Sequence, residues 1–94
     1  PTLAFVPEPG ATGLTIVNKS DGGRTFSLTG LPADDLQIQV DNNSGVIQEL
    51  SHGYNLYDGF NLNFFRLVPG GNDLEITGDG MLTISGRFLY NVAA

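Results

Sequence analysis

The 94-residue chain contains no cysteine. This absence excludes a disulfide framework, a thiol nucleophile and a zinc site built on cysteine ligands. Basic residues are scarce as well: four Lys and Arg stand against ten Asp and Glu, which leaves a formal net charge of −6 at pH 7. Nucleic acids and anionic membranes are bound by concentrated Lys and Arg, so neither is an expected partner of this chain.

Long apolar runs are also missing. No stretch approaches the roughly 18 consecutive apolar residues of a membrane span, and no basic, apolar signal peptide opens the sequence. We therefore expect no membrane insertion. The sequence starts at Pro1 rather than at Met, and we expect a processed chain or a piece cut from a longer protein. Its length suits one domain with a modest core.

Short alternations of apolar and polar residues run through the chain, and the 13 glycines and five prolines leave few windows for a helix. In the clearest alternation, DDLQIQVD at 34–41, the side chains of Leu36, Ile38 and Val40 share one face. Period two predicts half-buried strands. About seven such segments separated by turn signals predict an all-β fold, an antiparallel β-sandwich or jelly roll. The other candidates in the first half are 14–18, 24–29 and 46–50, and the facing of 46–50 stays open because Val46 and Ile47 are adjacent.

The first 13 residues have a different composition. Proline stands at positions 1, 7 and 9, and glycine at positions 10 and 13. This composition favours an extended segment. We therefore predict an N-terminal arm or linker at 1–13 and a single β-sandwich domain at 14–94. Residues 2–6 could still add an edge strand.

A hairpin is predicted near the end of the chain. Apolar residues occupy alternate positions on both sides of Gly78-Asp79-Gly80. A three-residue loop there would place Leu74 opposite Ile84 and Ile76 opposite Leu82, with Gly80 in the left-handed conformation. The alternation continues to Phe88 and Tyr90.

A turn is predicted just before this hairpin, at Val68-Pro69-Gly70-Gly71. Proline fixes φ at the second position of a type II turn and glycine accepts positive φ at the third. The side chain of Asn72 follows directly, and we expect its amide to hydrogen-bond the turn backbone.

Catalytic chemistry finds little support in the sequence. Ser51 and His52 are adjacent, so in an extended chain they point opposite ways and cannot readily share a proton. The carboxylates of Asp34 and Asp35 diverge for the same reason. We expect no enzymatic activity and no cofactor.

A metal site is weighed at 41–45, where the sequence DNNSG supplies oxygen ligands and a glycine. The segment lacks the spacing and the distal bidentate Glu of an EF-hand calcium loop. We expect a plain turn there and no bound metal, and a calcium-dependent lectin stays the less favoured alternative.

Aromatic residues cluster in and after the irregular stretch 51–61. Exposed rings there could stack on sugars or anchor a protein partner, whereas buried rings would plug one end of the sandwich. The candidate binding residues are Tyr54, Tyr57 and Phe60, and the cluster continues with Phe64 and Phe65.

The sequence RLVPGGNDLEITGDG at 66–80 resembles the distal tail (Dit-like) proteins of bacteriophages with long non-contractile tails and of related prophages. Their pattern is Arg/Phe-Leu, two residues, Gly-x-Asn, then Leu-x-Ile-x-Gly and a final strand. The stretches LQIQVDNNSGVIQEL and GYNLYDGFNLNFFRL are similar to that family's strand, turn and connector, whereas 1–23 has no counterpart. The matching residues here are Arg66, Leu67, Gly70, Asn72, Leu74, Ile76 and Gly78, with 82–88 as the final strand.

The resemblance implies the C-terminal β-sandwich, galectin-like or carbohydrate-module-like, of a protein at the tail tip. In that family the N-terminal portion, which this chain is too short to include, forms hexameric rings, and the C-terminal portion projects outward to hold adhesion or baseplate components. The likeness implies a non-enzymatic structural module of the virion tail, assembled in the host cytoplasm. Its partners would be other tail or baseplate proteins and, in the full-length protein, further copies of itself. The alternative is a carbohydrate-binding module that uses the loop aromatics on a cell-surface glycan.

Overall fold

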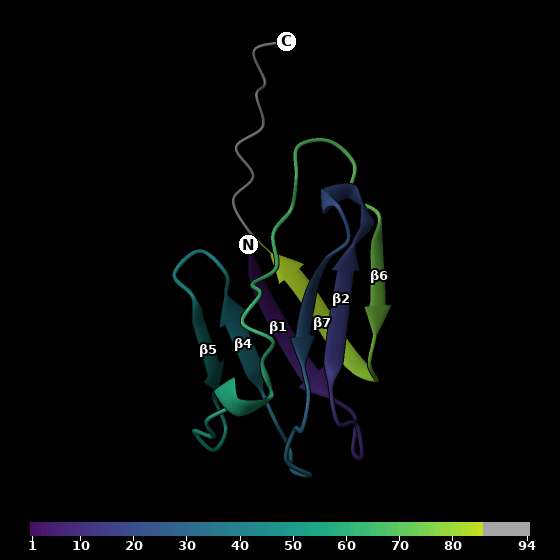
Figure 1. The fold of residues 1–94 in the computed structure, drawn as a ribbon. Helices are drawn as coiled ribbons and strands as arrows, with labels where there is room; N and C mark the ends of the chain where they lie inside the picture. The colour runs from purple at the N-terminus through teal and green to yellow at the C-terminus, as the bar shows by residue number, and fades with distance from the viewer. Residues whose placement is uncertain (86–94) are drawn as a thin grey trace.

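The computed structural model describes residues 1–85. Within this range the chain forms seven strands and two short 3-10 helices (Figure 1). The strands are β1 (Thr2–Pro7), β2 (Leu14–Asn18), β3 (Arg24–Leu28), β4 (Ile38–Asp41), β5 (Val46–Glu49), β6 (Leu74–Thr77) and β7 (Gly80–Ser85), and the 3-10 helices are η1 (Lys19–Asp21) and η2 (Tyr57–Gly59).

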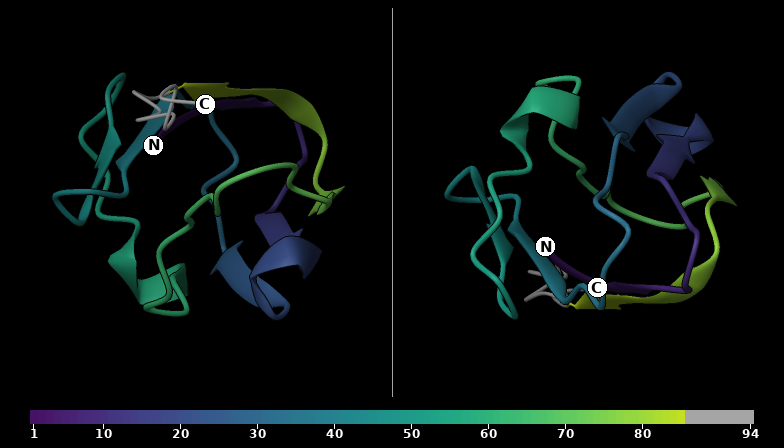
Figure 2. Two further views of the ribbon diagram at one scale, coloured as in Figure 1. Left: turned by 90° about the horizontal axis from the view of Figure 1, so that it is seen from above. Right: turned by 90° about the horizontal axis from the view of Figure 1, so that it is seen from below.

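The strands form two antiparallel sheets packed face to face. The four-stranded sheet has the order β5-β4-β1-β7, and the three-stranded sheet has the order β3-β2-β6. The views along the strands show the two sheets facing each other as two layers (Figure 2). The predicted antiparallel β-sandwich is confirmed.

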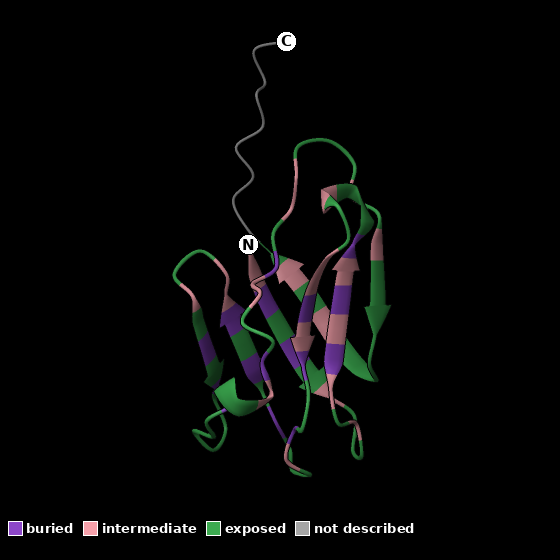
Figure 3. Ribbon diagram, viewed as in Figure 1, coloured by how far each residue is buried: buried purple, intermediate pink, exposed green. Residues whose placement is uncertain are grey.

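Alternating burial along the strands explains why the chain folds this way (Figure 3). In β2 the side chains of Leu14, Ile16 and Asn18 are buried and the two residues between them are half-buried. The predicted alternation of 34–41 is also confirmed. The buried apolar residues are Leu3, Phe5, Leu14, Ile16, Phe26, Leu28, Leu31, Leu36, Ile38, Val40, Ile47, Leu56, Phe60 and Phe65.

The structure settles the facing of β5, which the sequence left open. Ile47 and Glu49 point into the sandwich, whereas Val46 and Gln48 point outward. A carboxylate therefore occupies an inward position, and its partners are described with the candidate site below.

The predicted N-terminal arm is wrong for Thr2–Pro7. This segment is β1, the strand between β4 and β7, and its Leu3 and Phe5 side chains are buried. Proline is tolerated here because Pro7 stands at the last position of the strand, where its missing N–H leaves the ladder intact. The next residue, Glu8, donates its N–H to the Asp79 carbonyl at 2.9 Å.

The predicted β6–β7 hairpin is also wrong. The two segments are strands, but β6 pairs with β2 in one sheet and β7 pairs with β1 in the other. Gly78 and Gly80 have φ of 146° and 151° and turn the chain from one layer to the other. A Cβ at Gly80 would clash with the Val6 carbonyl oxygen, so glycine is needed there for close packing rather than for a hairpin loop.

The facing predicted for these two strands nevertheless agrees with their register. Ile76 lies beside the buried Ile16, and Leu82 lies beside the buried Phe5. Each alternation was therefore assigned to the correct face, although the two faces belong to different sheets. Phe88 and Tyr90 lie outside the described residues.

The turn at 68–71 has the predicted features. Gly70 has a φ of 88°, as the third position of a type II turn requires. The Asn72 side chain accepts a hydrogen bond from the Val68 N–H at 2.9 Å and donates to the Val68 carbonyl at 2.9 Å and the Gly70 carbonyl at 3.3 Å. This expectation is confirmed.

One side of the sandwich, between β3 and β5, is covered by residues 57–65; we call it the closed flank. Phe60 forms an isolated bridge with Leu28 of β3. Its ring lies 5.5 Å from that of Phe26 and 4.7 Å from that of Phe64, centroid to centroid. These aromatic side chains fill the gap between the two layers, so the core is complete on this side.

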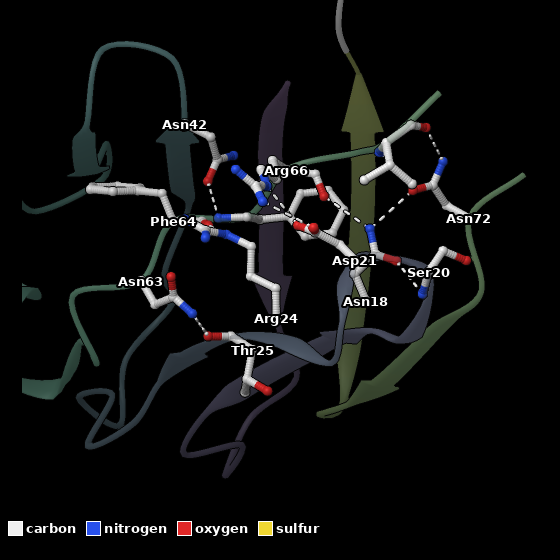
Figure 4. Close-up of polar contacts among 12 residues, drawn as sticks. Asn18, Ser20, Asp21, Arg24, Thr25, Asn42, Asn63, Phe64, Arg66 and Asn72 are labelled. Carbon is white, nitrogen blue, oxygen red and sulfur yellow. Dashed lines mark hydrogen bonds and ion pairs between the residues drawn. The ribbon is translucent and has the colours of Figure 1, made fainter. Parts of the chain in front are cut away.

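Side chains from other segments fix the irregular connector 61–73 that follows (Figure 4). The Asn42 Oδ1 accepts a hydrogen bond from the Phe65 N–H at 2.8 Å. Arg24 Nε donates to the Phe64 carbonyl at 2.7 Å. Backbone groups that would pair within a ladder are here satisfied by side chains, as buried polar groups must be.

Asn18 anchors the far half of this connector. Its side chain is fully buried, and its Nδ2 donates to the Arg66 carbonyl and to the Asn72 Oδ1, each at 3.0 Å. Its Oδ1 accepts from the Ser20 N–H at 3.0 Å. The Arg66 guanidinium adds a two-point contact to the Asp21 carboxylate, at 2.6 and 3.0 Å, which lowers the pKa of Asp21.

The opposite side, formed by β6 and β7, is less covered; we call it the open flank. Figure 3 shows no buried residue on either strand. Ile76 faces inward beside the fully buried Ile16, yet it is 48% exposed. Leu82 and Ile84 are half-buried. The core is therefore incomplete on this flank.

Candidate binding surface in the 50–57 loop

The loop 50–57 joins β5 to η2 and contains two of the three predicted binding residues. At the start of the loop, the Leu50 N–H donates to the Gln37 carbonyl at 2.7 Å. The backbone turns at Gly53, which has a φ of 73°, and the Gly53 N–H donates to the Glu49 carbonyl at 3.0 Å. The loop is therefore tied at its base to the strand that precedes it and to the segment before β4.

The buried side chain of Glu49 organises this loop. Its carboxylate accepts backbone N–H groups of Gln37 at 3.0 Å, Ser51 at 3.0 Å and His52 at 2.6 Å. Burial by itself would raise the pKa of Glu49, but these hydrogen bonds, together with the nearby His52 ring, outweigh it and lower the pKa from 4.5 to about 2. The carboxylate is thus ionised at neutral pH and fixes three backbone groups at once.

His52 lies between two carboxylates. Its Nδ1 is 3.2 Å from Glu49 Oε1, and its Nε2 is 3.4 Å from Asp34 Oδ2. The Tyr54 hydroxyl donates to the same Asp34 oxygen at 2.8 Å. This hydrogen bond lowers the pKa of Asp34 and raises that of Tyr54. The loop is thereby joined to the bend at 33–34.

The Tyr54 ring stacks on the His52 ring with a centroid distance of 5.0 Å and an interplanar angle of 18°. Tyr54 is 38% exposed and Leu50 is 57% exposed. The loop therefore presents the Leu50 and Tyr54 side chains to solvent on a backbone that hydrogen bonds to Glu49 hold in place. Such a surface can bind a partner without a large loss of conformational entropy.

The other predicted binding residues have different surroundings. Tyr57 is 41% exposed, and its hydroxyl accepts the Ile47 N–H of β5 at 2.8 Å. Phe60 is 8% exposed and belongs to the core, so its ring is not available to a ligand. Phe65 is buried and Phe64 is half-buried. Of the three candidate binding residues, Tyr54 and Tyr57 are therefore exposed and Phe60 is buried.

The sequence candidates for catalysis and metal binding have structural roles. Among residues 1–85 no hydrogen bond joins the Ser51 hydroxyl to His52, whose ring nitrogens face carboxylates instead. Asp41 Oδ1 accepts the N–H groups of Asn43 at 3.0 Å and Ser44 at 3.2 Å, which closes the turn at 41–45. No group of three metal-ligating side chains occurs in the described part of the chain.

The role of Glu49 as the organiser of this loop was not predicted from the sequence. The signal was present, because Glu49 follows the inward-facing Ile47 at a spacing of two. This spacing could not identify Glu49 as an inward residue, because the sequence did not show which face of 46–50 points into the sandwich. The partnership of Tyr54 with Asp34 left no local signal, since 20 residues separate them.

The described residues also include no helix that is long and apolar enough to cross a membrane. The fold and this loop define a class of domain: an antiparallel β-sandwich that presents a preorganised aromatic loop. The chain belongs to the phage tail C-terminal domain family, whose model matches residues 6–86. No curated protein and no solved structure matches the chain.

Proposed function

We propose that this phage tail domain is the outward-projecting C-terminal module of a distal tail (Dit-like) protein. In this role it is non-enzymatic and docks adhesion or baseplate components at the tail tip. Family membership supports the tail context. The residues 66–80, which resemble distal tail proteins, support the position at the tip.

The residues of that resemblance act in folding. Gly70 permits the turn, Asn72 closes it, and Gly78 lies so near the Gly13 backbone that a Cβ would come within 2.8 Å of its carbonyl oxygen. Arg66 pairs with Asp21. Since these residues maintain the fold, binding specificity must come from surfaces outside the motif.

The observation that carries the docking function is the fixed loop 50–57. Leu50 and Tyr54 are exposed on a backbone that Glu49 holds with hydrogen bonds. Exposed aromatic residues on a rigid support are typical anchors of protein interfaces. This loop is therefore the surface that we assign to the partner.

Immuno-electron microscopy tests the position. Particles of the phage that encodes this chain are labelled with an antibody raised against residues 1–94. We expect label at the distal end of the tail. Label distributed along the tail tube would contradict the tail-tip assignment while leaving the tail family intact.

Particle composition tests the docking surface. Phages carrying Leu50→Asp with Tyr54→Ala should assemble tails that lack an adhesion or baseplate component, as measured by quantitative mass spectrometry of purified particles. Thr77→Ala is the matched control, since Thr77 is exposed on β6, in the other sheet and away from the loop. Unchanged composition in the loop variant would exclude this surface as the docking site.

A second candidate function, glycan binding, is favoured by the stacking of Tyr54 on His52 beside the Asp34 carboxylate. An exposed ring next to a hydrogen-bond acceptor can bind a sugar. A glycan array with the purified domain tests it. Binding that is lost in Tyr54→Ala but kept in Tyr54→Phe would support the glycan function, and absence of binding on a broad array would favour protein docking.

A further inference from the structure

The four sheet edges of the sandwich are protected to different extents. The edge of β3 is covered by backbone hydrogen bonds to Gly59 and Asn61. On β5 the Ile47 N–H is bound by the Tyr57 hydroxyl. Natural proteins also protect strand edges with charged residues and proline. On β6 the charged Glu75 serves this purpose, paired with Lys19 at 3.2 Å.

In the described part of the chain, the remaining edge, that of β7, has none of these protections. Its sequence GMLTIS contains no charged residue and no proline. Within residues 1–85 no loop or side chain donates to or accepts from the outer edge of this strand. An uncharged strand with an unoccupied edge is a ready site for pairing with another strand.

The register identifies the backbone groups that this edge presents. The bond from the Glu8 N–H to the Asp79 carbonyl marks a hydrogen-bonded pair. Because such pairs alternate along an antiparallel ladder, Met81 and Thr83 direct their backbone groups toward β1. The groups of Gly80, Leu82 and Ile84 then point outward. Pro7 lies opposite Gly80. This pair is one that exchanges no hydrogen bonds, so the missing N–H of proline leaves no gap in the β1–β7 ladder.

Apolar side chains flank this edge on both faces of its sheet. On the outer face Val6 and Met81 are cross-strand neighbours that are 50% and 72% exposed. On the inner face Leu82 and Ile84 are half-buried, and Ile76 of β6 in the facing sheet is 48% exposed. The incomplete core of the open flank therefore lies beside the unprotected edge.

We propose that β7 pairs with β7 of a second copy of this chain, antiparallel, so that two four-stranded sheets become one. A chain of net charge −6 repels a second copy over most of its surface, and β7 is an edge where two copies can meet without bringing like charges together. The strand is also self-complementary under two-fold symmetry, which is the commonest symmetry of homo-oligomers.

The outward backbone groups fix the register of this pairing. The outward N–H and C=O groups of Gly80, Leu82 and Ile84 all form hydrogen bonds when Leu82 lies opposite Leu82 of the second copy and Gly80 lies opposite its Ile84. Met81 then lies opposite Thr83 on the outer face. Both inner faces lie on the same side, so the two open flanks meet and cover Ile76. The loop 50–57 stays free, because β5 and β7 are the opposite edges of the sheet.

Sedimentation equilibrium of the 94-residue chain tests the pairing. We expect a reversible dimer that weakens at least about tenfold in Met81→Lys with Thr83→Lys, since this change places like charges directly opposite each other in the proposed register. Val46→Lys with Gln48→Lys is the matched control. It adds the same charges at two outward positions of β5, at the other edge, and should leave the dimer unchanged.

Three outcomes would overturn the proposal. One is a wild-type chain that stays monomeric at its highest soluble concentration. A second is equal weakening by both lysine pairs. The third is a monomer whose Leu82 and Ile84 amides are protected from hydrogen exchange, since the edge would then be covered from within the same chain.

Cysteine cross-linking tests the register, and the absence of native cysteine makes the readout unambiguous. Residues opposite each other in a non-hydrogen-bonded antiparallel pair are about 4.5 Å apart at Cα, within the range of a disulfide. An oxidised mixture of Met81→Cys and Thr83→Cys chains should form heterodimers, whereas a mixture of Met81→Cys and Gln48→Cys should not. Cross-linking of Thr83→Cys chains alone that exceeds the mixture would exclude this register.

Discussion

The two flanks of the sandwich have the same kind of strands but reach different degrees of completion. On the closed flank Phe60 and Phe64 fill the gap between the layers, and side chains hold the adjoining connector. On the open flank Ile76 faces inward and remains 48% exposed. Period-two patterning thus directs a side chain toward the core without ensuring that the core covers it.

The two flanks can be compared through a pair of identical side chains, Ile16 and Ile76. Ile16 and Ile76 are the same residue type, lie beside each other in register and face the same side of one sheet. One is fully buried in the central strand and the other is half exposed in the edge strand. Any difference between them reports the surroundings rather than the side chain.

The largest effect is expected from Ile16→Ala. Truncation of a fully buried Ile removes apolar burial and leaves a cavity, which costs about 2–5 kcal/mol of unfolding free energy. Chemical denaturation monitored by circular dichroism measures it. A loss as small as that of Ile76→Ala would remove the distinction between the flanks.

A smaller loss is expected from Asn18→Ala, which breaks the polar support of the connector. The Arg66 carbonyl and the Ser20 N–H lose their side-chain partner, at about 1–3 kcal/mol. Asn63→Ala is the control, because Thr25 O keeps a second donor in Asn61. Equal melting temperatures for the two variants would show that the connector does not depend on Asn18.

Glu49→Gln should change how stability depends on pH. The folded-state pKa of Glu49, about 2, lies below its ordinary value of 4.5. The carboxylate therefore stabilises the fold fully above pH 4.5, and this stabilisation is lost as the pH falls toward 2. The amide nitrogen of glutamine would face backbone donors, so the variant is less stable at neutral pH. The gap between its melting temperature and that of the wild type should narrow over this range.

A gap that stays constant down to pH 2 would contradict the assignment of Glu49 as the ionised organiser of the loop. Other carboxylates with lowered pKa, such as Asp21 and Asp34, affect both proteins alike. The difference between the two curves therefore isolates Glu49.

The smallest loss is expected from Ile76→Ala in the isolated monomer, about 1 kcal/mol or less, because a half-exposed side chain removes little surface from water. The loss should grow with protein concentration if two open flanks meet. Denaturation curves at two concentrations measure both effects. A large loss at low concentration would mean that the open flank is already complete within one chain.

Sequence patterning predicted the local part of this fold. The alternation at 34–41 predicted the correct face for β4, and Asn72 closes the turn that Pro69 and Gly70 begin. These features depend on neighbours within a few residues. The facing of Leu82 and Ile76 was correct for the same reason.

Strand pairing was not predictable in the same way. β6 and β7 are separated by two residues, but their partners β2 and β1 lie more than 50 positions earlier in the chain. The three prolines in 1–13 led to the prediction of an arm instead of β1, because composition alone does not show that Pro7 is the last residue of a strand. In the candidate site, the exposure of Tyr54 and the burial of Phe60 depend on long-range packing that their similar sequence surroundings did not distinguish.

The pairing of Thr2 with Ser85 has a mechanical consequence. The first and last residues of the β1–β7 ladder are hydrogen-bonding neighbours at one end of the sandwich, beside the N-terminus in Figure 1. Tension applied through Thr2 and Ser85 would break the β1–β7 hydrogen bonds one after another, starting at this end. Tension applied from opposite ends of the ladder would instead load all of these hydrogen bonds together. Under load this domain should open at low force from that corner, while β2 and β3 stay folded.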